Sequence, residues 1–542
     1  MKKAVLFLFA ASMPVSAQIF AEHNFSRKDS LHGGLRPERT SYDVQRYDLD
    51  IRIDTEAKTI TGFNDITFRV VEETGKIQVD LFDNMSVDSI VSDNKKLTYT
   101  REFNAVFIDF ADRLKKGSRH KIRFYYSGTP IAAPRAPWQG GFDWKKDKNG
   151  KTFAGVAVQG TGASLWYPVK DTQTDEPDKG ATIKVAVPNG LMNVSNGRFR
   201  GSKDLEDGYT RWDWEVKNPI NTYDITVNIG DYAHIHDTYK GLDLDYYVLK
   251  YNEAKAKEHF QEVKTMMDCF QAKFGKYPFA DDGYKLVETP YLGMEHQSAV
   301  AYGNEYKKGY RGNDLSGTGI GMTFDYIIIH ETGHEWFGNS ITSQDIADMW
   351  IHEGFTMYSE AVYVECTLGY DKAVEYMNGI RKNIYNYDTV IGQYGVNNEG
   401  SGDMYPKGAW LLHTMRHVVA DDAKWWKMLL NYSEHFRHKI ITTQDVDEFF
   451  SKEMGMDLTP VFNQYLRTVK IPTLSFTETN GKISYRYENT EPGFAMPVDI
   501  EIGGKKRRIH PTDKLQELEA GTKLSDVKVR TDHFLINTMG LP

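Results

Sequence analysis

The chain has 542 residues, which is too long for one compact core and indicates two to four domains. Hydrophobic residues make up 40% of it and aromatic residues 13%, a composition that excludes a disordered chain. The net charge of −9, without a long basic tract, argues against nucleic acid as the main partner.

The first residues, MKKAVLFLFAASMPVSAQ, have the layout of a secretory signal peptide over residues 1–17. Lys2 and Lys3 form the positive start, residues 4–13 form the apolar segment, and the small residues up to Ala17 predict cleavage there. The alternative is an apolar N-terminal strand or anchor. No later segment has 18 consecutive apolar residues, so we expect an exported protein, periplasmic or secreted, without an integral membrane segment.

A period-two pattern of apolar residues begins after a polar stretch and continues to about residue 240. Tyr47, Leu49, Ile51 and Ile53 alternate with charged residues, which is typical of half-buried strands. We therefore predict a β-rich N-terminal domain over residues 18–242.

From Asn252 the apolar pattern becomes helical. The segment EAKAKEHFQEVKTMMDCFQAKFG predicts an amphipathic helix that ends at Gly275. Further helical patterns follow, and one of them begins with a capping box of Thr442 and Asp445. Residues 243–470 are therefore predicted to form a helix-rich domain.

The pattern returns to strands in residues 471–542, around an Asn480–Gly481 pair typical of a tight hairpin. We predict a small C-terminal β-sandwich domain here, which makes the fold class multidomain α+β. The run GGKKRRIH predicts a second, exposed hairpin. Recognition of substrate carboxylates or acidic surfaces by Lys505–Arg508 is the alternative function of that run.

The two cysteines, Cys269 and Cys366, both fall in predicted helices. Two cysteines do not make a disulfide framework, so we interpret them as separate buried thiols. In an oxidising compartment they could instead pair.

The stretch YIIIHETGHEWFGNS contains an H-E-x-x-H pattern. His330 and His334 are four residues apart, so on a helix they can present ring nitrogens to one metal ion. Glu331 lies beside them and can hold a metal-bound water without being a ligand. Core or surface histidines are the alternative interpretation of a single His.

Glu353 supplies the third ligand of the predicted site, with 18 residues between it and the second histidine. A His–His–Glu set with an open position is typical of catalytic Zn²⁺, and we expect one ion per chain. The neighbouring His352 would face another side of its helix. Glu360 and Asp348 are candidates for orienting the histidines.

At these motifs the chain resembles the zinc aminopeptidases of the aminopeptidase N and leukotriene hydrolase family. Those enzymes carry H-E-x-x-H, 18 residues and Glu, after an upstream G-x-M-E-N segment. Here YLGMEHQSAVAYG contains Gly293, Met294 and Glu295, 35 residues before the first zinc histidine. The resemblance implies that Glu295 binds the free α-ammonium of the substrate, with Gly293 and Met294 in the same substrate-binding segment. The family's Asn is His296 here and its first Gly is Leu292, which changes the local pocket.

Two further segments resemble the family. In GDMYPKGAWLL, Tyr405 matches the tyrosine whose phenol stabilises the oxyanion. In VAVQGTGASLWYPVK, Gln159 lies nine residues before Pro168 and matches a glutamine that contacts substrate. The family's usual Arg and Phe before that Pro are missing.

The resemblance covers about residues 40–540 and implies a saddle-like first domain and a thermolysin-like catalytic domain. Many members have a large helical C-terminal domain, and we expect that the predicted domains leave no room for one in this chain. We therefore expect a zinc aminopeptidase acting on peptides with a free N-terminus. The alternatives are another zinc hydrolase on the same frame, such as an endopeptidase or an epoxide hydrolase, and a non-catalytic peptide-binding homologue. The motifs leave the oligomeric state open.

Overall fold

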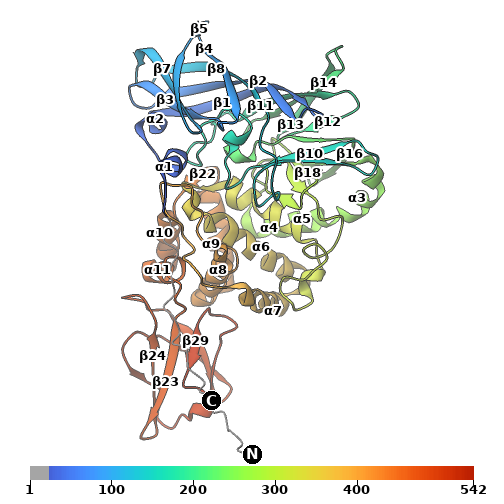
Figure 1. The fold of residues 1–542 in the computed structure, drawn as a ribbon. Coiled ribbons are helices and arrows are strands. Elements are labelled where there is room, and N and C mark those ends of the chain that lie inside the picture. Colours follow the sequence, from blue (N-terminus) through green and yellow to red (C-terminus); the bar gives the residue numbers. More distant parts are fainter. Residues whose placement is uncertain (1–23) are drawn as a thin grey trace, which may run out of the picture.

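The computed structural model describes residues 24–542, in three parts that follow one another along the chain (Figure 1). A β-rich N-terminal part lies at one end, a helix-rich part in the middle, and a small β-rich part at the other end. This arrangement confirms the predicted α+β fold class. The predicted signal peptide lies outside the described residues. Within residues 24–542, no helix is long and apolar enough to cross a membrane.

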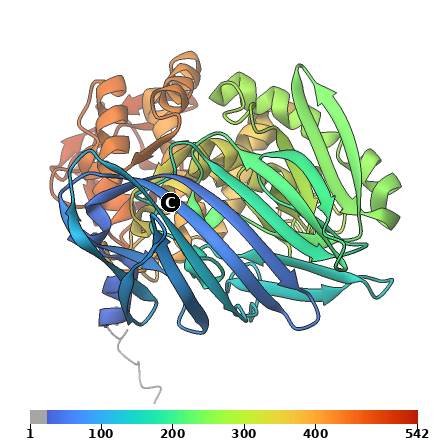
Figure 2. The ribbon, with the colours of Figure 1, turned by 90° about the horizontal axis from the view of Figure 1, so that it is seen from above.

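The N-terminal part is built on an eight-stranded sheet with the order β13-β14-β11-β1-β2-β8-β4-β5, whose long strands run side by side in Figure 2. At its centre, β1 (Tyr42–Asp54) and β2 (Thr59–Val70) form a long antiparallel hairpin. The alternation of buried and half-buried residues along β1 is the period-two pattern of the sequence, since one face of the sheet covers the core. The other strands of this sheet are β4 (Met85–Ser92), β5 (Lys95–Lys96), β8 (Arg119–Gly128), β11 (Ala181–Pro188), β13 (Arg198–Asp204) and β14 (Tyr209–Val216).

Smaller elements complete the N-terminal part. Helices α1 (Arg27–Gly33) and α2 (Pro37–Thr40) precede the hairpin. A three-stranded sheet contains β3 (Thr74–Asp80), β7 (Ala105–Leu114) and β6 (Thr98–Glu102). A four-stranded sheet contains β12 (Met192–Val194), β15 (Asn228–Gly230), β10 (Thr152–Ala157) and β9 (Gly141–Lys146), in that order. All six residues of β10 are buried, and the chain leaves this strand two residues before Gln159.

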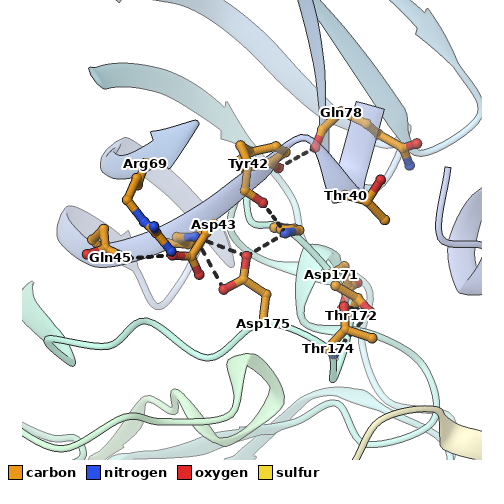
Figure 3. Close-up of polar contacts among 12 residues, drawn as sticks. Thr40, Tyr42, Asp43, Gln45, Arg69, Gln78, Asp171, Thr172, Thr174 and Asp175 are labelled. Atoms are coloured by element: carbon orange, nitrogen blue, oxygen red, sulfur yellow. Dashed lines mark hydrogen bonds and ion pairs between the residues drawn. The ribbon is translucent and has the colours of Figure 1, made fainter. Parts of the chain in front are cut away.

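The acidic loop between β10 and β11 uses its carboxylates to hold the backbone (Figure 3). Asp175 accepts hydrogen bonds from the backbone amide of Val44 at 3.0 and 3.2 Å. Asp171 accepts one from the backbone amide of Ser164 at 3.0 Å. Because buried carboxylates need such partners, Asp171 fixes the turn that follows Gln159, and Asp175 holds the loop against β1.

A five-stranded sheet begins the helix-rich part, with the order β16-β17-β18-β20-β19. The sequence predicted a domain boundary between residues 242 and 243. The hairpin of β16 (Tyr232–Tyr239) and β17 (Leu242–Leu249) crosses this position, and both of its strands belong to the five-stranded sheet. The remaining strands are β18 (Tyr284–Glu288), β19 (Gly293–Met294) and β20 (Val300–Tyr302). Strand β19 delivers Glu295 to the side of the helix that carries both histidines.

The helical part is centred on α6 (Trp350–Leu368), which is buried from Trp350 to Val364. A Cβ atom on Gly354 of α6 would lie 3.0 Å from the Cα of Gly408 in α8 (Pro406–Val419), so two glycines let these helices approach closely. The predicted capping box of Thr442 and its acidic partner begins α10. The helices are α3 (Glu253–His259), α4 (Glu262–Phe274), α5 (Tyr326–Gly333), α6 (Trp350–Leu368), α7 (Tyr370–Ile380), α8 (Pro406–Val419), α9 (Asp422–His435), α10 (Thr443–Met454) and α11 (Thr459–Leu466). The short strands β21 (Ile341–Ser343) and β22 (Lys439–Ile441) pair in parallel between them.

The single helix predicted after Asn252 is in fact two helices, α3 and α4, with a break at Phe260. The break lets the Phe260 ring pack edge-on against Tyr302 of the sheet, with ring centroids 5.0 Å apart. Gly275 ends α4 with a positive φ of 93°, as the sequence predicted.

Cys269 of α4 and Cys366 of α6 form a disulfide bond, with Cα atoms 6.0 Å apart. The prediction of separate buried thiols is therefore wrong. The two cysteines are 97 residues apart in sequence, and only the packing of α4 against α6 brings them together. The bond ties α4 to the helix that carries Glu353.

The C-terminal part contains two small sheets, with the orders β27-β24-β23-β29 and β26-β25-β28. Asn480 and Gly481 have φ values of 53° and 73° and form the predicted tight turn. Arg508 in the second hairpin donates to the backbone carbonyls of His417 and Val418 in α8, so it docks this part on the helices. The strands are β23 (Thr473–Thr479), β24 (Lys482–Glu488), β25 (Val498–Ile502), β26 (Lys505–Ile509), β27 (Gln516–Glu517), β28 (Val527–Val529) and β29 (Asn537–Met539).

Candidate active site

Helix α5 presents His330 and His334 on one face. Asp325 caps its N-terminus by accepting hydrogen bonds from the amides of Ile327 at 3.0 Å and Ile328 at 3.4 Å. The helix therefore starts one turn before His330, and the two imidazole rings have centroids 5.1 Å apart. This is the arrangement that the i, i+4 spacing predicted.

Glu353, in the first turn of α6, completes a set of three donors with the two histidines. Its Oε2 atom lies 3.5 Å from Nε2 of His330 and 3.2 Å from Nε2 of His334, and this buried oxygen makes no hydrogen bond. Ligands about 2.0–2.1 Å from a tetrahedral Zn²⁺ are about 3.3 Å apart. Two imidazoles and an unpartnered buried carboxylate oxygen therefore fit one zinc ion.

The other ring nitrogens of the histidines are fixed by hydrogen bonds. Nδ1 of His330 donates to Oε1 of Glu360 at 2.7 Å, and the Tyr376 hydroxyl donates to the other Glu360 oxygen at 2.5 Å. Nδ1 of His334 donates to the backbone carbonyl of Phe337 at 3.0 Å. Both rings therefore keep Nε2 free for a metal.

Of the two carboxylates predicted to orient the histidines, the structure brings only Glu360 to them. Asp348 instead accepts hydrogen bonds from Tyr394 and Thr443, so its predicted role is wrong. Asp348 lies in the turn that leads into α6, away from the histidine-bearing faces. His352 accepts a hydrogen bond from the Ser343 amide at 2.8 Å and lies outside the donor set, as predicted.

Glu331 points into the space beside the donor set. A Cβ atom on Gly293 would lie 2.8 Å from Oε1 of Glu331, so the missing side chain in β19 makes room for this carboxylate. The neighbouring Met294 is buried and pairs with Ala301 of β20. Burial raises the pKa of Glu331.

Glu295 lies in the same space and is held from three sides. Its Oε1 atom accepts hydrogen bonds from Nε2 of Gln159 at 2.5 Å and from the Tyr223 hydroxyl at 3.2 Å. Nδ2 of Asn339 donates to its backbone carbonyl at 2.7 Å. Carboxylate oxygens of Glu295 and Glu331 and a ring nitrogen of His334 lie within 4.8 Å of one another. Burial raises the pKa of Glu295.

Tyr405 lies at the N-terminus of α8, and its ring stacks on His330 with centroids 6.1 Å apart. Burial, and then the nearby Glu353 carboxylate, raise the pKa of its hydroxyl well above the ordinary value. The phenol therefore stays protonated and can donate a hydrogen bond beside the donor set.

The residues predicted to bind metal or substrate or to act in catalysis line one cavity of about 940 Å³ between the N-terminal and helical parts: Gln159, Gly293, Met294, Glu295, His330, Glu331, His334, Glu353 and Tyr405. Other residues at or beside this cavity were not predicted, and three of them bear on the site. Tyr223 supports Glu295, Trp138 lies at the rim with 45% of its surface exposed, and Glu399 enters from the loop before α8. None of them has a motif or a spacing to another site residue that would have marked it in the sequence.

Comparisons with known proteins match both of the larger parts. Residues 43–223 match the family model described as "Peptidase M1 N-terminal domain", and residues 258–465 match "Peptidase family M1 domain". Aminopeptidase N of Lactobacillus helveticus is 23% identical over 463 residues, 80% of this chain and 52% of that protein. Aminopeptidase B of Rattus norvegicus is 30% identical over 345 residues, 59% of this chain and 50% of that protein. The chain thus spans about half the length of the curated relatives it matches.

Solved structures show the same fold. A mutant M1 zinc metallopeptidase from Deinococcus radiodurans, bound to a Tyr-Ser-Ala substrate, superposes with a TM-score of 0.65 at 19% identity, covering 80% of this chain and 95% of that one. A two-domain M1 zinc metallopeptidase bound to L-tryptophan gives 0.62 at 20% identity, covering 78% and 92%. At these identities the likeness concerns the fold alone.

Proposed function

The chain belongs to the M1 peptidase family, and from this premise we propose that it is a zinc-dependent aminopeptidase that releases N-terminal amino acids from peptides. The observation that supports this most directly is the position of Glu295. Its buried carboxylate shares one cavity with the His–His–Glu donor set. A carboxylate beside a hydrolytic metal centre selects substrates that place a cation one residue from the scissile bond.

His330, His334 and Glu353 would hold the zinc ion. Bound there, zinc lowers the pKa of a water molecule and polarises a carbonyl group. Glu331 is not part of this donor set. It accepts the proton of the attacking water and returns it to the leaving amine, as a general base and then a general acid.

The remaining residues position the substrate and its developing charge. Glu295 binds the α-ammonium, in a charge-assisted hydrogen bond worth about 1.5–3 kcal/mol. Gln159 already uses its amide nitrogen on Glu295, so its carbonyl oxygen is left to accept a second ammonium proton. Tyr405 donates a hydrogen bond to the oxyanion, on the His330 side of the cavity.

Peptides with an acetylated N-terminus are expected to be cleaved far more slowly than the same peptides with a free one. Acetylation removes the charge that Glu295 pairs with, and a loss of about 1.5–3 kcal/mol corresponds to roughly 10- to 150-fold in kcat/KM. The acetyl group also needs room beyond Glu295. The measurement is kcat/KM for matched free and acetylated peptides.

The variant Glu295→Gln is the control for that experiment. It removes the negative charge while keeping the shape, so in this variant acetylation costs less activity than in the wild type, because only the steric demand of the acetyl group remains. Equal cleavage of free and acetylated peptides by the wild-type protein would exclude an aminopeptidase and favour an endopeptidase on the same frame.

We also propose that the protein is exported, to the periplasm or beyond the cell, after cleavage near Ala17. The signal-like leader supports this, and so does the disulfide between Cys269 and Cys366, because such bonds persist in oxidising compartments. N-terminal sequencing of the protein recovered from its native host is expected to begin near Gln18. A mature protein that begins at Met1 would contradict export by this route.

A further inference from the structure

A second group of histidines and a carboxylate lies on the hairpin of β16 and β17, outside the cavity. His234 and His236 are two residues apart on β16, so their side chains leave the same face of the strand. Asp245 lies directly opposite His236 on β17. The pairing register therefore gathers all three side chains on one face of the hairpin.

The three side chains converge on one point. Nε2 of His234 lies 2.7 Å and Nδ1 of His236 lies 2.9 Å from the same oxygen, Oδ1 of Asp245. These atoms all lie within 4.8 Å of one another. In the described chain, the two other sets of this kind both contain His334 and belong to the cavity. The hairpin group is therefore a separate donor set.

The hairpin set has the same composition as the catalytic set. In both, one carboxylate oxygen faces two imidazole nitrogens, at 2.7 and 2.9 Å here and at 3.5 and 3.2 Å around Glu353. Ligand atoms around tetrahedral zinc are about 3.3 Å apart, so the hairpin set must open by about half an ångström to hold an ion. Side-chain rotation can supply this, because the two histidine side chains are 41% and 55% exposed.

The surroundings hold part of the set in place and leave the rest open to solvent. The His234 ring stacks on Tyr247, with centroids 4.4 Å apart and planes at 4°. Tyr247 is buried against Trp214 of the N-terminal part, so this support is rigid. The second ring nitrogens of the histidines have no carboxylate partner, unlike His330, which bonds to Glu360. A site with open positions and weak outer support binds metal more weakly than the catalytic one.

We propose that His234, His236 and Asp245 form a second metal site, for a divalent transition-metal ion of the zinc class. Two imidazoles and one carboxylate are the donors that suit zinc, copper and nickel, and water fills the open positions. The ion joins β16, the edge strand of the five-stranded sheet, to β17. Its occupation stabilises this edge hairpin.

The test is a titration of the holoprotein, already carrying one Zn²⁺ per chain, with further Zn²⁺ in a calorimeter. We expect one additional ion per chain and a melting temperature that rises with zinc concentration. In His236→Gln and in Asp245→Asn the additional event weakens at least about 10-fold, since loss of outer partners alone lowers metal affinity about 10- to 100-fold. The first zinc stays bound in both variants.

His510→Gln is the matched control, because it removes an exposed histidine that belongs to none of the donor sets. It is expected to bind the additional ion as the wild type does. Absence of a second event in the wild type would overturn the proposal. A second event that persists unchanged in both His236→Gln and Asp245→Asn would also overturn it, because the ion would then bind elsewhere, for example at Glu295 and Glu331.

Discussion

The variant Glu331→Gln loses turnover of peptides while its zinc content stays at one ion per chain. Glu331 lies outside the set of His330, His334 and Glu353, so the amide leaves the metal donors intact. The amide cannot take up a proton, and loss of a positioned general base lowers kcat by about 10²- to 10⁴-fold. Glutamine has nearly the same side-chain volume as glutamate. This matters because the Glu331 carboxylate fits against Gly293 so closely that even one added Cβ atom there would clash with it.

The measurements for this variant are kcat on an amino-acid anilide and metal content by elemental analysis. Glu399→Gln is the matched control, because it removes another carboxylate from the same cavity and is expected to keep most of its turnover. A Glu331→Gln protein with zinc bound and kcat within about tenfold of the wild type would contradict the role of Glu331. Loss of zinc would instead place Glu331 among the ligands.

The donor set could be predicted from the sequence because its geometry is mostly local. His330 and His334 share one helical face, and Glu353 lies in the first turn of the helix packed beside them. The strands of the N-terminal part were also visible, since one buried face imposes a period of two. Patterns of this kind are set by residues close together in the chain, so they can be recognised in the sequence alone.

The missed features depend on contacts between distant segments. Tyr223 reaches Glu295 from a segment 72 residues earlier, and no periodicity links the two. The Cys269–Cys366 bond requires the packing of α4 on α6. The partner of His334 is the backbone carbonyl of Phe337, and a carbonyl carries no sequence signal. For this reason the sequence suggested the carboxylate of Asp348 as an orienting group, whereas in the structure the main-chain carbonyl of Phe337 orients His334.

The cavity explains how residues from both larger parts act together. Gln159 comes from the N-terminal part, where the acidic loop fixes the turn after it, and its amide contacts Glu295 of the five-stranded sheet. The Glu295 carboxylate is thus oriented across the junction of two parts. Changes that shift this junction are therefore expected to alter substrate binding before they alter the metal site.

Tyr405→Phe is expected to lower kcat by about 10²- to 10³-fold with little change in KM. In the proposed mechanism the hydroxyl donates to charge that develops only in the transition state, and loss of such a donor costs about 2.7–4 kcal/mol. The phenylalanine ring keeps the stacking on His330, so the donor set is undisturbed. The raised pKa of the Tyr405 phenol means that it is protonated across the neutral range, so the deficit should not depend on pH there.

Tyr310→Phe provides the matched control for this last experiment. Tyr310 packs edge-on against Tyr326 near the same histidine, with ring centroids 5.3 Å apart, and its own hydroxyl lies outside the residues assigned to substrate or metal. Removing that hydroxyl tests whether any lost phenol near the site slows the reaction. If Tyr405→Phe and Tyr310→Phe both keep kcat near the wild-type value, the oxyanion has another donor. If Tyr405→Phe raises KM and leaves kcat unchanged, Tyr405 binds the ground state and the transition state equally.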